Sequence, residues 1–215
     1  MTMMNTREGW GLVHRLMHWA AAIVILFQLA MGLYMVNVVT DLYDRFAYTQ
    51  THKSWGFVAF VLVLARIAWR WKNPRPDPVE MPRWQHTASE GAHIALYVLM
   101  IVLPVSGWLM SSASPLQDLY GVKNMVFGVF ELPDPFVPGS DPLDKALKAV
   151  HFYAGIAMLL IIGVHVAAAM KHHFVDRDGL LRRMVFGIAA PATADLAGDH
   201  GPDHSAVPER GLRSR

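Results

Sequence analysis

Histidine is frequent in this chain, with 11 of 215 residues, and four histidines stand out among those inside long apolar stretches or at their ends. These are His18, His52, His151 and His165. An ionisable side chain within an apolar stretch is costly, which makes it a candidate for function. Neutral imidazole is a good ligand for iron and other transition metals. The four residues are therefore the first candidates for a metal-binding site.

Composition excludes several other kinds of chemistry. Cysteine is absent, which excludes disulfides, thiolate nucleophiles, iron–sulfur clusters and haem attachment through C-x-x-C-H. Charged residues make up 17% of the chain, compared with about 25% in soluble domains. The mean hydropathy of +0.28 also argues against a soluble protein. The net charge of +2 gives no reason to expect nucleic acid as a partner.

Four apolar stretches are long enough to cross a membrane, which requires about 20 residues. They are residues 16–36, 52–71, 93–113 and 149–170. The second contains Arg66 near its end, where a long side chain can reach the headgroups. The third contains Pro104, which a helical bundle tolerates. The sequence therefore predicts an all-α, integral membrane four-helix bundle within residues 10–184.

Basic residues predict the orientation of this bundle. They gather between the second and third stretches and after the fourth: Arg70, Lys72, Arg75, Arg83, Lys171, Arg177, Arg182 and Arg183. The positive-inside rule then places both termini in the cytoplasm. The loop between the third and fourth stretches faces outward, with a short helix expected around Gln117 to Phe130. Residues 187–215 lack apolar periodicity and predict a disordered cytoplasmic tail.

Helical spacing arranges the four histidines in pairs. Fourteen residues, close to four turns, separate His151 from His165, so both lie on one face and roughly 21 Å apart along the axis. His165 then reaches the depth of His18, and His151 that of His52. Two imidazoles facing each other suit a bis-histidine haem, whereas zinc usually needs further ligands. No Asp or Glu lies within the four stretches. The spacing predicts two haem-binding pairs stacked across the membrane.

Several segments of the chain resemble the prokaryotic cytochrome b561 family. They are HRLMHW (14–19), THKSWG (51–56), LARIAWRWKNPRP (64–76), GAHIALYVLMIVLPVSGWLMSS (91–112), AVHFYAG (149–155) and the stretch from GVHVAAAMKHHF to DGLLRRM (163–184). The resemblance implies that the axial ligands of that family fall on the same four histidines. His18 and His165 would hold a cytoplasmic haem, and His52 and His151 a periplasmic one.

The resemblance also implies a function. The best-understood type in the family is a superoxide:ubiquinone oxidoreductase with two b-type haems in the bacterial inner membrane. It would transfer single electrons across the bilayer, oxidising superoxide outside and reducing ubiquinone. Its expected partners are the lipid bilayer, a quinone, and superoxide or another small electron donor. Whether such a protein is an enzyme or a pure electron carrier stays open, and no catalytic residue is assigned. One alternative is a cytochrome b electron-carrier subunit of a dehydrogenase, and another is a histidine-based metal transporter.

Two further residues are candidates at the cytoplasmic end. Arg66 is placed to bond haem propionates by charge-assisted hydrogen bonds. His172 lies seven residues beyond His165, nearly two turns, and so on the same face. A histidine can supply a proton at a quinone carbonyl, and the resemblance implies a quinone site at this end. An ordinary surface position for His172 is an equally good reading.

Other polar residues have weaker claims. His14, one turn before His18, could compete for iron but is expected at the headgroup level, and His93 is expected at the interface. Glycines close to the four histidines would leave room for a flat macrocycle: Gly56, Gly155 and Gly163. Outward-facing lysines could attract an anion, although acids share that side: Lys53, Lys123, Lys145 and Lys148.

Overall fold

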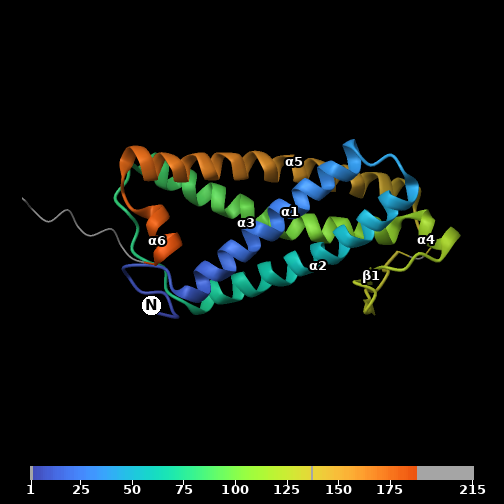
Figure 1. Ribbon diagram of the computed structural model, residues 1–215, viewed down its shortest axis with the longest axis horizontal. Helices are drawn as coiled ribbons and strands as arrows, with labels where there is room; N and C mark the ends of the chain where they lie inside the picture. Colours follow the sequence, from blue (N-terminus) through green and yellow to red (C-terminus); the bar gives the residue numbers. More distant parts are fainter. Residues whose placement is uncertain (1, 137, 188–215) are drawn as a thin grey trace, which may run out of the picture.

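The computed structural model describes residues 2–136 and 138–187, most of them in four long helices (Figure 1). The helices are α1 (Leu12–Asn37), α2 (Leu42–Lys72), α3 (Arg83–Ala113) and α5 (Asp141–Lys171). Each is long and apolar enough to cross a membrane. All four predicted stretches lie within these helices, so the prediction of a membrane four-helix bundle is confirmed.

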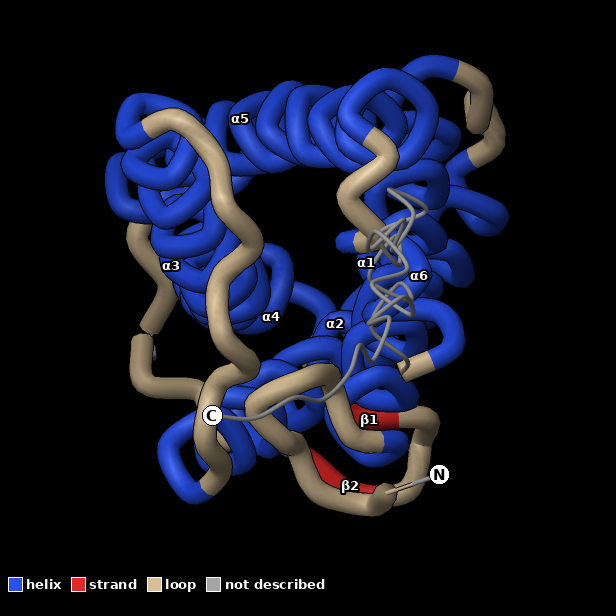
Figure 2. The backbone as a smooth tube through the Cα atoms, turned by 90° about the vertical axis from the view of Figure 1, so that its left-hand side faces the viewer, coloured by secondary structure: helices blue, strands red, loops and turns tan. Residues whose placement is uncertain are grey.

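The four long helices pack in sequence order. α1 packs on α2, α2 on α3, and α3 on α5 (Figure 2). The buried apolar core is small and centres on Val63, Met100 and Met158. Large apolar side chains such as Ile23 and Val164 are about two-thirds exposed. These outer faces fit contact with lipid, which provides no hydrophobic penalty for an exposed apolar side chain.

One end of the bundle gathers the N-terminal segment, the connection between α2 and α3, and the short helix α6 (Leu180–Phe186) (Figure 1). Arg15 on α1 donates a hydrogen bond to the carbonyl of Val185 at 2.7 Å. Arg183 on α6 donates to the carbonyl of Asp77 at 3.0 Å. These bonds hold α6 against the bundle at the end predicted to face the cytoplasm. Of the predicted tail, residues 188–215 lie outside the described residues.

The opposite end carries α4 (Pro115–Tyr120) and a small hairpin of β1 (Met125–Val126) and β2 (Phe130–Glu131). The helix expected around Gln117 to Phe130 is therefore wrong beyond Tyr120. Gly121 ends α4 with φ of 62°, where glycine has no steric cost. Phe127 and Gly128 then form the hairpin turn with φ of 49° and 70°, values that no α-helix contains.

The absence of cysteine makes the orientation directly testable by labelling. Val129 lies at the hairpin end and Val175 at the α6 end, and both are well exposed, at 80% and 71%. In spheroplasts, we expect a membrane-impermeant maleimide to label the Val129→Cys variant at once. We expect it to label Val175→Cys only after the membrane is opened. The cysteine-free parent supplies the blank, and the reverse labelling pattern would contradict cytoplasmic termini.

Candidate functional site

One pair of histidines lies near the hairpin end, with His52 on α2 facing His151 on α5. Their ring centroids are 6.2 Å apart and the ring planes are inclined by 81°. His151 Nδ1 lies 3.0 Å from the carbonyl oxygen of Leu103. Since a carbonyl only accepts, Nδ1 carries the proton and Nε2 keeps its lone pair. This second-sphere hydrogen bond is the usual way to orient a metal-binding imidazole.

The second pair lies toward the α6 end, with His18 on α1 facing His165 on α5. Their centroids are 6.5 Å apart at an inclination of 54°. Both separations match the requirement of one metal between two imidazoles. A ring nitrogen binds a first-row metal at about 2 Å and the ring centre lies about 1 Å farther, so the two centres are about 6.2 Å apart. Rings in direct contact would be closer.

The helices that carry each pair are not among the closely packed pairs. α5 packs against α3, whereas its histidines face α1 and α2 across the interior. In the described part of the chain, only His172, Asp176 and Asp178 form a group of three possible metal ligands. Neither histidine pair therefore has the third and fourth protein ligands of a zinc site. The donor set suits a metal whose remaining positions are filled by a macrocycle.

Two buried polar atoms of the described residues lack hydrogen-bond partners, which is consistent with a bound group between the helices. In the described structure, His52 Nδ1 and Arg66 Nε have no hydrogen-bond partner. Arg66 and Arg70 lie over the ring of Tyr97, at 5.6 Å and 5.4 Å from its centroid. No acid among the described residues forms an ion pair with either arginine. A half-buried cation without a counter-ion is costly, so an anionic group at this position is favourable.

Comparison with known proteins identifies the kind of group. A profile described as prokaryotic cytochrome b561 matches residues 9–187. The chain belongs to the prokaryotic cytochrome b561 family. It is a membrane electron carrier, and the family implies a b-type haem. The haem fits the facing imidazoles and the arginines that lack counter-ions among the described residues.

The relatives include proteins from two organisms. Cytochrome b561 homolog 2 of Escherichia coli (strain K12) is 32% identical over 190 residues, covering 86% of this chain and 95% of the relative. Cytochrome b561 homolog 1 of the same organism is 30% identical over 138 residues, covering 63% and 73%. The probable superoxide oxidase CybB of Yersinia pestis is 31% identical over 137 residues, covering 62% and 72%.

Of the other histidines of this cytochrome, His93 lies nearer the inner pair than expected, and His14 is buried against an aromatic ring. The ring of His93 packs against His165 with centroids 5.5 Å apart, which is closer than two ligands of one metal. His14 is only 3% exposed, and its ring stacks on Trp10 at 4.0 Å. The depth of His93 at the start of the third stretch was the signal that could have indicated this contact.

The glycines beside the ligands differ from those predicted. A Cβ on Gly107 would lie 3.1 Å from Cε1 of His151, and one on Gly32 would lie 3.7 Å from Cε1 of His52. For the predicted glycines, the nearest described side-chain atom is Gln28 Nε2 at 3.2 Å from Gly56 and Leu103 Cδ2 at 4.0 Å from Gly155. At Gly163 no described atom lies within 4 Å. Glycine thus makes room for the imidazole itself at position 107, whereas a Cβ at position 32 would make an ordinary van der Waals contact.

Most of the outward-facing lysines are neutralised. Ion pairs join Lys123 to Glu131 at 2.7 Å, Lys145 to Asp141 at 2.8 Å, and Lys148 to Asp144 at 2.6 Å. Glu131 also raises the pKa of Lys123 above its ordinary value through a hydrogen bond. These pairs leave little free positive charge on the three side chains.

Lys53 differs because it is held by neutral groups beside His52. Its Nζ donates to Asn124 Oδ1 at 3.0 Å and to Ser111 Oγ at 3.3 Å, and Asn124 in turn donates to Asp134. A cavity of about 530 Å³ opens nearby, lined by residues that include Thr51, Ser54, Phe127 and Lys123. Thr51 and Ser54 flank His52 and Lys53 in sequence, but neither His52 nor His151 is among the residues that line this cavity.

The contact at Gly107 generates a test of haem retention. We expect Gly107→Ala to weaken haem binding about fivefold, because overpacking costs about 1 kcal/mol at its lower limit. Gly155→Ala is the matched control, since its Cβ would have 4.0 Å of clearance. Alanine favours a helix more than glycine does, so a lower helix propensity cannot explain a loss. The haem-to-protein ratio of the purified variants measures the effect, and equal ratios would contradict the contact.

Proposed function

We propose that this cytochrome holds two b-type haems, one between His18 and His165 and one between His52 and His151. The two centroid separations, 6.5 Å and 6.2 Å, are the observation that carries the proposal. Each haem would supply a reversible one-electron change, with its iron held by two histidines of this chain. Two histidine ligands would leave no position for oxygen, which suits electron transfer rather than oxygen activation. With 14 residues between His151 and His165 along α5, the two centres would lie roughly 21 Å apart in depth.

The chain's own residues would orient the ligands and balance the charge. Leu103 fixes the proton of His151 on Nδ1 through the bond at 3.0 Å. At the inner pair, Arg66 Nη2 lies 2.9 Å from His18 Nδ1. Because arginine only donates, Nδ1 accepts in this arrangement, whereas a metal-bound His18 carries its proton there. Arg66 then needs another acceptor, and a haem propionate at the same end supplies one.

We further propose that superoxide is oxidised at the outer face and ubiquinone is reduced at the inner face of the bacterial inner membrane. One relative, at 31% identity, is named a probable superoxide oxidase. Lys53, which follows His52 in sequence and is held by the neutral Asn124 and Ser111, supports attraction of an anionic donor to the outer face. His172, near the inner pair, supports a quinone site because reduction of a quinone needs protons. The reaction would make the protein a superoxide:ubiquinone oxidoreductase.

The family assignment bears on the alternatives. It favours electron transfer over the metal-transporter alternative, since the bundle interior offers paired histidines without carboxylates. A cytochrome b subunit that serves a dehydrogenase would use the same haem ligands with another electron donor. The donor therefore distinguishes the two functions, and the ligands do not.

Replacing single ligands tests the two-haem arrangement. We expect His151→Ala and His165→Ala each to retain about half of the haem, because each removes one ligand pair. The remaining haem should differ between the two variants in its reduced-minus-oxidised spectrum and midpoint potential. Ser106→Ala, which removes only a hydroxyl 3.1 Å from His151 Nδ1, serves as a control that keeps both ligands. Equal loss of both haems in both variants, with the helical content intact, would contradict the arrangement.

Electron donors and acceptors test the reaction. We expect superoxide generated around the purified oxidised protein to reduce the haems, and a soluble ubiquinone analogue to reoxidise them. Superoxide dismutase should abolish the reduction, which controls for other reductants in the generating system. If the haems stay oxidised under superoxide but are reduced by a membrane dehydrogenase, the carrier-subunit alternative is correct.

A further inference from the structure

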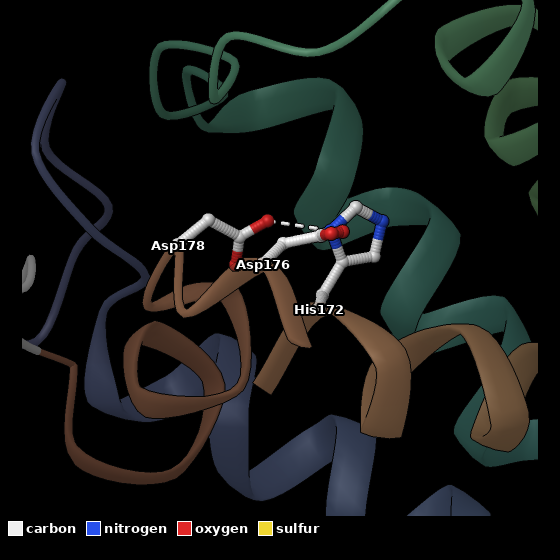
Figure 3. Close-up of side chains that lie close together, drawn as sticks. All are labelled: His172, Asp176 and Asp178. Atoms are coloured by element: carbon white, nitrogen blue, oxygen red, sulfur yellow. Dashed lines mark hydrogen bonds and ion pairs between the residues drawn. The ribbon is translucent and has the colours of Figure 1, made fainter. Parts of the chain in front are cut away.

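The inner end of α5 closes into a short acidic loop around His172. The π-helix η1 (His172–Asp176) continues α5 and ends at Arg177, which has a left-handed φ of 53°. This reversal brings Asp178 back to the imidazole, with Oδ2 2.5 Å from Nδ1 (Figure 3). The other oxygen of Asp178 accepts from the backbone N–H of Leu180 at 3.0 Å, just where α6 begins.

Two carboxylates face the same ring nitrogen, but they differ in their other partners. Asp176 Oδ2 lies 3.1 Å from His172 Nδ1 and 2.5 Å from Lys171 Nζ, so a lysine already balances its charge. Within the described chain, Asp178 forms an ion pair with His172 alone. The side chains of His172 and Asp178 are only 15% and 13% exposed. Asp178 therefore lies closer to His172 than Asp176 does, is less exposed to solvent, and has no lysine among the described residues that balances its charge.

These separations are hydrogen-bond distances. His172, Asp176 and Asp178 have the composition of a cation site, yet a metal would hold its ligand atoms about 3 Å or more apart. A carboxylate only accepts, so the proton of His172 lies on Nδ1. Figure 3 shows the two carboxylates on one side of the ring and its second nitrogen on the other side. Nε2 is thus left to meet a ligand.

We propose that Asp178 is a positioning residue for His172 in quinone reduction, which makes this inference rest on the proposed function. Asp178 holds Nδ1–H and stabilises the positive charge of the ring, so that Nε2–H is oriented toward a quinone carbonyl. Two superoxide anions lose one electron each and become two molecules of oxygen. The quinone gains those two electrons and two protons and becomes the quinol. His172 gives one proton from Nε2 and regains it from water, and the inner aqueous phase supplies the other.

In the part of the chain that the structure describes, the basic side chains at the adjoining ends of α5 and α6 do not form ion pairs with Asp178. α5 contributes Lys171, which is paired with Asp176. α6 contributes Arg182 and Arg183, and Arg183 donates to the carbonyl of Asp77 at 3.0 Å. Neither arginine forms an ion pair with Asp178 in the described structure. The negative charge of Asp178 thus acts mainly on His172.

Asp178→Asn tests the proposal because it keeps the shape and the acceptor for Leu180 N–H but removes the charge. The haems are first reduced with dithionite, and their reoxidation by a soluble ubiquinone analogue is then followed per haem. We expect a rate at least tenfold lower than in the parent, with an unchanged haem spectrum. Because proton donation becomes limiting, the variant should also slow further in D2O than the parent does. A merely structural role would not change this solvent isotope effect.

Asp77→Asn is the matched control. It removes the same charge at the same end of the bundle, from an exposed residue whose hydrogen bonds to Arg7 and Arg183 use the backbone. We expect this variant to reoxidise at the parental rate. His172→Gln should match the loss in Asp178→Asn, and the double variant should lose no more than either one, since both act through one group.

The outcomes separate this proposal from the function on which it rests. Parental rates in Asp178→Asn, or additive losses in the double variant, would overturn the role of Asp178 and leave quinone reduction standing. If the reduced parent protein is not reoxidised by the quinone analogue, the proposed quinone reaction and this proposal both fail.

Discussion

The structure depends on a spacing constraint between facing imidazole rings. Two rings can share one metal only if their centres are about 6 Å apart, so the helices that carry them cannot pack closely. The observed separations of 6.2 Å and 6.5 Å meet this condition at two depths. α5 satisfies it twice by packing on α3 while its histidines face α1 and α2. The buried core is small and centres on Val63, Met100 and Met158, which agrees with wide spacing between these helices.

The interior of this bundle contains buried polar groups, and apolar side chains cannot form hydrogen bonds or ion pairs with them. Arg66 lies at the inner pair without a paired carboxylate among the described residues, and His52 Nδ1 is buried without a partner. Buried polar groups of this kind are expensive. In a protein that binds its group tightly, the cost is offset on binding, so haem binding and the stability of the bundle are coupled. In the proposed arrangement, the b-type haem of the family would therefore contribute to the fold as well as to the redox chemistry.

A feature of this structure can be predicted from the sequence where a single physical property determines it. Apolar length predicts the four helices, and helical rise along α5 predicts that His151 and His165 face partners at different depths. Contacts that depend on neighbouring helices do not follow in this way. Gly107 touches His151 across α3 and α5, and a sequence offers no reason to prefer it over Gly155. His93 against His165 is a contact of the same kind.

The loops also contain features that the sequence does not predict. The segment after Tyr120 could be read as a helix because its residues allow one, but Gly121 and the turn at Phe127 direct the chain into a hairpin. At the other end, the approach of Asp178 to His172 requires a left-handed residue at Arg177, where arginine gives no local signal. Periodicity therefore places His172 on the correct face, but only the backbone reversal supplies its carboxylate.

The two ends of the bundle differ in a way that suits opposite halves of one electron-transfer reaction. At the hairpin end, three of the four lysines are paired with acids, and Lys53 is held by the neutral Asn124 and Ser111. A small donor that gives up only an electron needs access there but no proton carrier. At the inner end, His172 and Asp178 are largely buried and linked by a hydrogen bond of 2.5 Å. An acceptor that gains protons with its electrons needs such a pair, so the asymmetry of the side chains supports inward electron flow in the proposed reaction.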